Sequence, residues 1–253
     1  MFLMFKNFRV EISFKDLDQL KKKLDFCLNK NLYKINIPCK GNIKKDFLEE
    51  VVKFIGAEYK HLDVIYHYSF FHQFHKNKTI SYQIFLKFLE LNKIYNKGNE
   101  ILLVSGSKKR HKFEVLNILE ELKLDLNKNL NFGVAFNPYF LDDRDYRVER
   151  NRLIDKLNSC FVQSVWLQYG SEINQLSREI NFLNKTIINS KEFIKKGINI
   201  YGSLFIPSKQ FLARFKFRPW RGVYLSNKYL NSLEESAKIT KNIINFYLSN
   251  NII

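Results

Sequence analysis

Residues 62–107 have the sequence LDVIYHYSFFHQFHKNKTISYQIFLKFLELNKIYNKGNEILLVSGS. This stretch begins and ends with short, nearly continuous apolar runs, at residues 62–69 and 100–107, which are typical of strands in a parallel sheet covered by helices. Between them, residues 80–95 carry apolar side chains at helical spacing, and Gly98 follows as a helix stop signal. A strand, a helix and a second strand in this order predict one βαβ unit.

The same alternation continues along the chain in both directions from this unit. Eight strand–helix units, with a period of roughly 30 residues, predict an α/β fold with a single (βα)8 TIM barrel domain over residues 1–253. A doubly wound open sheet is the competing architecture, but the turn after the first predicted strand, EISFKDL, lacks the glycines of a dinucleotide-binding fingerprint. The predicted strands cover residues 8–13, 33–39, 62–69, 100–107, 131–140, 161–170, 198–208 and 222–226. The predicted helices cover residues 15–30, 44–54 with a stop at Gly56, 80–95, 112–124, 144–157, 172–183 with an extension to 196, 209–215 and 233–248.

Length and cysteine content limit the class of protein. The 253 residues, 45% of them hydrophobic, suffice for one barrel, although two smaller domains would also fit. No apolar run reaches about 18 residues, so we expect no transmembrane helix, no membrane partner and a cytoplasmic location. Cys27, Cys39 and Cys160 are unclustered, which indicates reduced thiols and no zinc site. A short run of histidines, at positions 67, 72 and 75, has no neighbouring acidic ligand, so we predict no metal site.

The formal net charge of +17 suggests attraction to nucleic acid or to an anionic membrane. However, Lys, Asn, Ile, Phe and Tyr are all abundant, and all have A/T-rich codons, so a biased genome explains the basic excess equally well. The lysines are also spread along the chain, and the longest run is Lys21–Lys23. A basic nucleic-acid-binding protein is therefore the third functional hypothesis.

In a barrel, functional residues lie at the carboxyl ends of the strands. Glu11 lies inside an apolar strand, so we expect a buried carboxylate that has a partner or a raised pKa; it is either a general acid or a structural group. The sequence VSGSKKRH at residues 104–111 favours a phosphate-binding loop or a plain surface turn. Gln168 offers one acceptor and two donors to the edge of a heterocycle, and Ser171 and Glu172 also fit the N-cap and first turn of the next helix.

Taken in chain order, the residues at the ends of the predicted strands resemble those of the methylenetetrahydrofolate reductase family along nearly the whole chain. Glu11 in VEISF resembles the family's strand-one glutamate, its proposed general acid. His67 and Ser69 in IYHYS resemble a His-x-Thr motif, and Gln168 in LQYG resembles the folate-contacting glutamine. The resemblance therefore implies that Glu11 and Gln168 are catalytic and that Gln168 also binds the substrate.

The resemblance also implies a flavin site, from which this sequence departs at several positions. Gly106 matches the centre of the family's Arg-Gly-Asp turn, but Ser105 and Ser107 replace the arginine and the aspartate. In GVAFNP, Asn137 replaces a flavin-contacting tyrosine, whereas Glu149 and Lys156 keep the family's acid-to-lysine spacing. The expected flavin-binding residues are His67, Ser69, Ser105, Gly106, Ser107, Ala135, Asn137, Glu149 and Lys156.

The resemblance implies an FAD-dependent oxidoreductase of one-carbon metabolism and methionine biosynthesis. Such an enzyme reduces 5,10-methylenetetrahydrofolate to 5-methyltetrahydrofolate with hydride from NADH or NADPH through the flavin. The alternative hypothesis is a non-flavin, folate-binding or partner-dependent homologue, which the altered Arg-Gly-Asp turn would suit. The expected partners are a folate-type small molecule and a nicotinamide cofactor; self-association into a homo-oligomer is left open.

Overall fold

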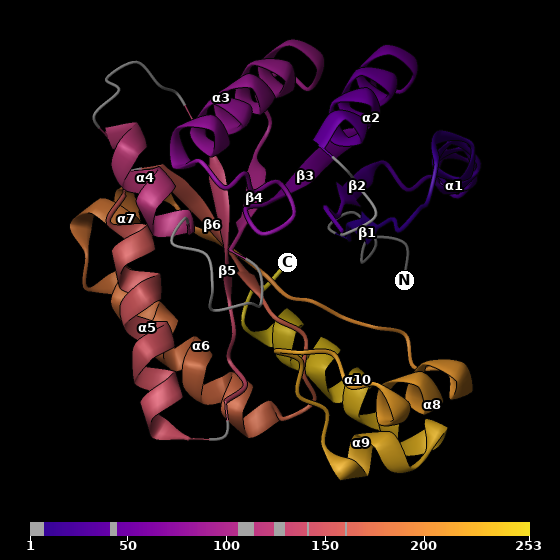
Figure 1. Ribbon diagram of the computed structural model, residues 1–253. Helices are drawn as coiled ribbons and strands as arrows, with labels where there is room; N and C mark the ends of the chain where they lie inside the picture. Colours follow the sequence, from indigo (N-terminus) through magenta and orange to yellow (C-terminus); the bar gives the residue numbers. More distant parts are fainter. Residues whose placement is uncertain (1–7, 41–44, 106–113, 124–129, 141, 160) are drawn as a thin grey trace. The chain divides into compact units, whose positions relative to one another are not determined.

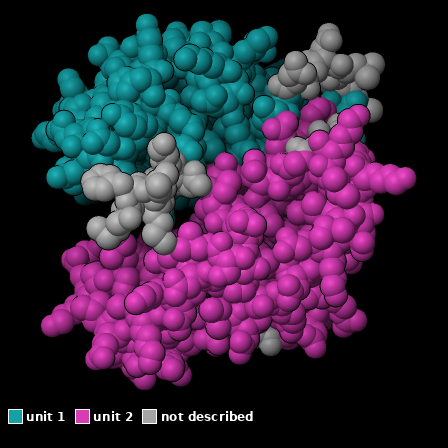
Figure 2. Space-filling view, turned by 180° about the vertical axis from the view of Figure 1, so that it is seen from behind, with its two compact units in different colours: residues 1–133 teal, residues 134–253 magenta. Residues whose placement is uncertain are grey.

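The computed structural model describes residues 8–40, 45–105, 114–123, 130–140, 142–159 and 161–253. The chain divides into two compact units, residues 1–133 and residues 134–253, here called unit 1 and unit 2 (Figure 2). Strands and helices alternate along both units, which confirms the predicted α/β class (Figure 1). The hydrogen-bonded order of the strands follows the sequence, from β1 to β7.

Unit 1 runs from β1 to the first residues of β5. Its strands are β1 (Val10–Glu11), β2 (Lys34–Ile37), β3 (Asp63–Ser69), β4 (Ile101–Val104) and the start of β5 (Phe132–Phe136). Its helices are α1 (Leu17–Asn29), α2 (Lys45–Glu58), α3 (Lys78–Tyr95) and α4 (Val115–Lys123). Asp16 and Asn77 start α1 and α3, because their side chains accept hydrogen bonds from backbone N–H groups of the first turn that have no partner inside the helix.

The two faces of the strands in unit 1 differ in chemistry. The β1–β2, β2–β3 and β3–β4 pairs are parallel. Tyr66 and Tyr68 of β3 are buried. Each makes an edge contact with a phenylalanine of α3: Tyr66 with Phe88, and Tyr68 with Phe85. Because side chains alternate across a strand, Asp63 and His67 project from the face opposite these tyrosines. One face of β3 therefore packs into an aromatic core under α3, and the other carries titratable groups.

Helix α2 continues past the predicted stop at Gly56 and ends at Glu58, so the prediction of its end was wrong. A Cβ added to Gly56 would lie 2.6 Å from the Cβ and the carbonyl oxygen of Tyr95, the last residue of α3. Gly56 therefore serves the close approach of α2 to α3 rather than the end of a helix.

Unit 2 contains the rest of β5 and two further strands, β6 (Val162–Leu167) and β7 (Asn199–Tyr201), which pair in parallel. Its helices are α5 (Asp143–Leu157), α6 (Ile173–Ile188), α7 (Lys191–Lys196), α8 (Lys209–Phe217), α9 (Asn227–Asn231) and α10 (Leu233–Ser249). A buried carboxylate joins α5 to α6: the Glu179 oxygens accept two hydrogen bonds from Arg150, at 2.8 and 2.6 Å, and one from Arg178 at 3.0 Å. This bidentate geometry compensates the cost of burying Glu179, whose side chain has no exposed surface.

The prediction of an eighth strand at residues 222–226 was wrong, and these residues contain no strand. Tyr224 makes a single parallel bridge to Gly170, just beyond β6, Gly222 has a φ of +79°, and Ser226 is already the N-cap of α9. On β7, the carbonyl of Ile200 accepts a hydrogen bond from the backbone N–H of Ile253 at 2.9 Å, and the N–H of Gly202 donates to the carbonyl of Ile253 at 2.8 Å. A turn and a helix cap therefore leave too few extended residues for an eighth strand at this position.

Candidate functional site

Glu11 lies at the end of β1, and its side chain is 48% exposed, so the expectation of a buried carboxylate was wrong. The reason is the length of β1, which has only two residues and ends at Glu11. Lys40, just beyond β2, places its Nζ 3.6 Å from the Glu11 carboxylate, and its side chain is 49% exposed. Both groups of this ion pair are therefore accessible to a ligand from solvent.

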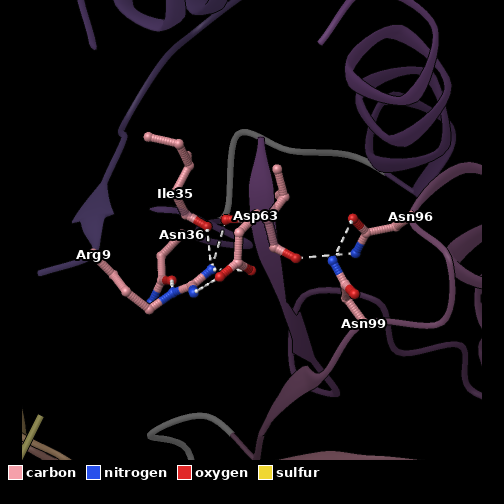
Figure 3. Close-up of polar contacts among 7 residues, drawn as sticks. Arg9, Ile35, Asn36, Asp63, Asn96 and Asn99 are labelled. Atoms are coloured by element: carbon pink, nitrogen blue, oxygen red, sulfur yellow. Dashed lines mark hydrogen bonds and ion pairs between the residues drawn. The ribbon is translucent and has the colours of Figure 1, made fainter. Parts of the chain in front are cut away.

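Arg9, directly before β1, anchors a polar network (Figure 3). Its side chain is only 7% exposed, and its guanidinium donates to Asp63 Oδ2 at 2.8 Å, to Asp63 Oδ1 at 3.2 Å and to the Asp63 carbonyl at 2.8 Å. The same guanidinium donates to the carbonyl of Ile35 at 3.1 Å and, through Nε, to Asn36 Oδ1 at 2.7 Å. Arg9 therefore joins β1 to both β2 and β3.

The bond from Arg9 fixes how Asn36 faces His67. Arginine has no acceptor atom, so the Asn36 oxygen must point toward Arg9, and the Asn36 Nδ2 must point away from it. That nitrogen lies 3.3 Å from His67 Nε2. Because Nδ2 can only donate, Nε2 accepts the hydrogen bond, and the His67 proton resides on Nδ1.

Electrostatics agree with a neutral His67. Burial lowers the pKa of His67 to about 4; Glu11 acts to raise it, whereas Lys40 and Arg9 act to lower it. At neutral pH, His67 is therefore a neutral hydrogen-bonding group rather than a proton donor from an imidazolium. We call Arg9, Glu11, Asn36, Lys40 and His67 the β1–β3 cluster.

The serines expected at the flavin stabilise turns within unit 1. Ser69 is buried, and its Oγ accepts from the backbone N–H of His72 at 3.4 Å. The Oγ of Ser105 accepts from the backbone N–H of Val115 at 3.3 Å, at the start of α4. Gly106, Ser107 and most of the predicted phosphate-binding loop lie outside the described residues, as does Cys160.

The flavin residues expected in unit 2 bond to one another. Lys156 is 6% exposed, and its Nζ donates to the carbonyl of Ala135 at 3.1 Å. The backbone N–H of Asn137 donates to Glu149 Oε1 at 3.1 Å, its Nδ2 donates to the carbonyl of Gly222 at 3.1 Å, and its Oδ1 accepts from the backbone N–H of Tyr139 at 3.0 Å. These bonds hold Lys156, Asn137 and Glu149 to other residues of unit 2.

Gln168 lies directly after β6, and its backbone N–H donates to the carbonyl of Phe136 at 2.7 Å. Its Oε1 accepts from the N–H of Tyr169 at 3.1 Å. The prediction that Ser171 caps α6 was wrong, because the N-cap is Glu172 and its side chain makes no cap hydrogen bond. The Oγ of Ser171 instead accepts from the backbone N–H of Ser226 at 2.7 Å and therefore holds the loop before α9.

Arg9, Asn36, Lys40 and Asp63 were not among the predicted site residues. A signal for them existed, since Arg9 and Glu11 are charged residues two apart in one apolar strand, and therefore share a face. Sequence reasoning considered only the carboxyl ends of the strands, whereas the network begins near their amino ends. Among the described residues, no group of three or more His, Cys, Asp and Glu side chains could hold a metal ion.

Comparison with known proteins does not identify the chain. No protein-family model matches it, and neither does any curated protein. One similar solved structure is the crystal structure of KGPDC from Streptococcus mutans, with a TM-score of 0.37 and 10% identity over 94% of this chain and 96% of that chain. A likeness this weak assigns neither a fold nor an activity. A further finding is that none of the helices in the described ranges is long and apolar enough to cross a membrane.

Proposed function

We propose that the chain binds a folate-type small molecule at the β1–β3 cluster, with Glu11 as the group that contacts the pterin. The observation that carries the proposal is the position of Glu11: its accessible carboxylate lies 3.6 Å from an ammonium group and is close enough to His67 to influence the pKa of that residue. A carboxylate can accept two parallel hydrogen bonds from the amino-pyrimidinone edge of a pterin. The net charge of +17 favours the carboxylates of a folate tail.

The proposed scaffold is a TIM-barrel-like parallel sheet similar to that of methylenetetrahydrofolate reductase, without the predicted eighth strand. Sequential strand order, parallel pairing and alternating helices support this part of the proposal. The resemblance of Glu11, His67 and Gln168 to the family's strand ends supports the choice of ligand.

The flavin-free form of this function is the form that we favour. The bonds that Lys156, Asn137 and Ser105 make within the protein support it, because each of these groups already has a partner inside the protein. The alternative form is the FAD-dependent reductase with NADH or NADPH as reductant. FAD, when bound, would supply the hydride transfer.

Titration calorimetry with tetrahydrofolate, in the presence and absence of added FAD, tests the proposal. We expect binding that is independent of FAD, and we expect Glu11→Gln to weaken it about 10- to 100-fold, because a hydrogen bond to a charged group is lost. Glu50→Gln is the matched control, because Glu50 is an exposed glutamate on α2 outside the cluster. If wild-type protein bound no tetrahydrofolate under either condition, the proposal would be rejected. Yellow protein that is reduced by NADH or NADPH would establish the reductase form instead.

A further inference from the structure

We propose that residues 206–221, here called the α8 surface, dock on an anionic membrane surface. This inference goes beyond the proposed function, because it concerns unit 2 and uses no residue of the β1–β3 cluster. Surface docking also needs no membrane-spanning helix. The expectation of no membrane partner followed from the lack of a long apolar run, whereas the net charge of +17 pointed to nucleic acid or an anionic membrane surface.

Charge is the first observation. Residues 193–233 contain eight Lys or Arg residues and no Asp or Glu, and five of these cations lie in the α8 surface. All five are exposed, and none forms an ion pair with an acidic residue in the described ranges. Three of them are arginines, Arg214, Arg218 and Arg221, in a chain with only ten arginines. Arginine pairs with phosphate through two parallel hydrogen bonds, so the local chemistry suits a phosphate-bearing partner.

Exposed apolar side chains are the second observation. Phe217 is 92% exposed and Ile206 is 91% exposed, whereas Leu212 and Phe215 are buried beneath α8. At 100° per residue, Phe217 lies on the side of the helix away from these two buried residues. Trp220 is 43% exposed. These side chains leave large apolar areas in water, and insertion below lipid headgroups would remove that cost.

The base of the α8 surface is held by aromatic packing. Trp220 makes edge contacts with Phe205, Phe211 and Phe215, with ring centroids 5.2, 5.6 and 6.0 Å apart. Phe205 and Phe211 stack with an angle of 7° between their planes. The surface is thus presented by an ordered cluster, and docking would require little ordering of side chains.

The chemistry favours lipid over nucleic acid. Single-stranded nucleic acid binds through stacking of bases on flat aromatic rings, and Ile206 has no flat face to offer. Both Ile206 and Phe217 can enter the boundary between headgroups and acyl chains, while the exposed cations of the α8 surface contact anionic headgroups. Exposed apolar side chains within a basic segment are therefore matched by an anionic bilayer surface.

Co-sedimentation of the full chain with vesicles tests the proposal. One set contains phosphatidylserine and phosphatidylcholine in equal parts, and the other contains phosphatidylcholine alone. We expect binding to the first set only, weakened about 100-fold when Arg214, Arg218 and Arg221 are all changed to Gln, at about fivefold per cation. Phe217→Ser should weaken binding about tenfold, because its apolar side chain no longer inserts.

Matched controls separate a local site from overall charge. The control for charge is the triple variant Lys21→Gln, Lys22→Gln, Lys30→Gln, which removes the same charge from unit 1. The control for apolar exposure is Phe26→Ser, since Phe26 is 60% exposed on α1. Both controls should bind vesicles like wild type.

Three outcomes would each overturn the proposal. They are equal losses of vesicle binding in both triple variants, unchanged binding by Phe217→Ser, and binding to oligothymidylate without binding to vesicles. Tetrahydrofolate binding by the α8 variants should stay unchanged, so failure here is distinguishable from failure of the proposed function.

Discussion

Acidification should destabilise the protein through His67. The pKa of His67 is about 4 in the folded protein, against 6.5 for an ordinary histidine, so the unfolded chain binds more protons between these values. Stability is therefore complete above the unfolded pKa and falls as the pH drops from about 6.5 toward 4. Integration of this difference gives a loss of about 2 kcal/mol between pH 7 and pH 5.

The structure shows why protonation is opposed. Asn36 Nδ2 donates to His67 Nε2, and a proton on that nitrogen would place two donors face to face. Asn36 cannot rotate its amide to compensate without losing the bond that its Oδ1 accepts from Arg9 at 2.7 Å. The low pKa of His67 therefore has both burial and a fixed hydrogen-bond direction behind it.

The test is urea unfolding at pH 7 and pH 5 for wild type and His67→Gln. The glutamine carbonyl can still accept from Asn36 but does not titrate, so wild type should lose about 2 kcal/mol more than the variant. Other groups that titrate in this range, such as His72, whose pKa is also lowered by burial, cancel in the comparison. If both proteins lost the same stability between the two pH values, the assignment of a neutral His67 with a lowered pKa would be refuted.

Two further predictions concern packing and charge in unit 2. Gly170→Ala should destabilise the protein by about 1–3 kcal/mol, because an added Cβ would lie 2.4 Å from the ring of Tyr139; an unchanged melting temperature would show that the ring can move aside. Glu179→Gln should cost about 3–5 kcal/mol in urea unfolding, since it leaves the Arg150 guanidinium without its buried carboxylate. Lys228→Gln, at an exposed ion pair, should cost less than about 1 kcal/mol, and similar losses for both variants would contradict this account.

Periodicity predicted the fold class well, because it reflects which faces are buried. The predicted helix at residues 80–95 is observed as α3 (Lys78–Tyr95), and the predicted strand at residues 62–69 is observed as β3 (Asp63–Ser69). Both have long apolar patterns that only one element type can satisfy. The end of α2 was predicted wrongly. Gly56 is a glycine because α2 lies close to Tyr95 of α3, and the local sequence does not show which other helix a residue contacts.

The chemistry of the site was less predictable than the fold. Glu11 was correctly expected at a strand end, but its exposure depends on β1 having only two residues. The role of Asn36 depends on Arg9, which lies 27 positions away in the sequence, so no motif could relate them. The bonds between Asn137, Glu149 and Gly222 are likewise long-range, and the spacing of an acid and a lysine did not reveal them.

The bonds of Ile253 to β7 have a consequence for solubility. A strand with open backbone groups is a template on which another chain can add, and proteins protect such strands from aggregation. Strand β7 has only three residues, and the carbonyl of Ile200 and the N–H of Gly202 next to it already bond to Ile253. Another chain therefore cannot pair with those backbone groups. The two hydrogen bonds to Ile253 protect this end of β7 from strand addition, a role that a longer neighbouring strand would otherwise fill.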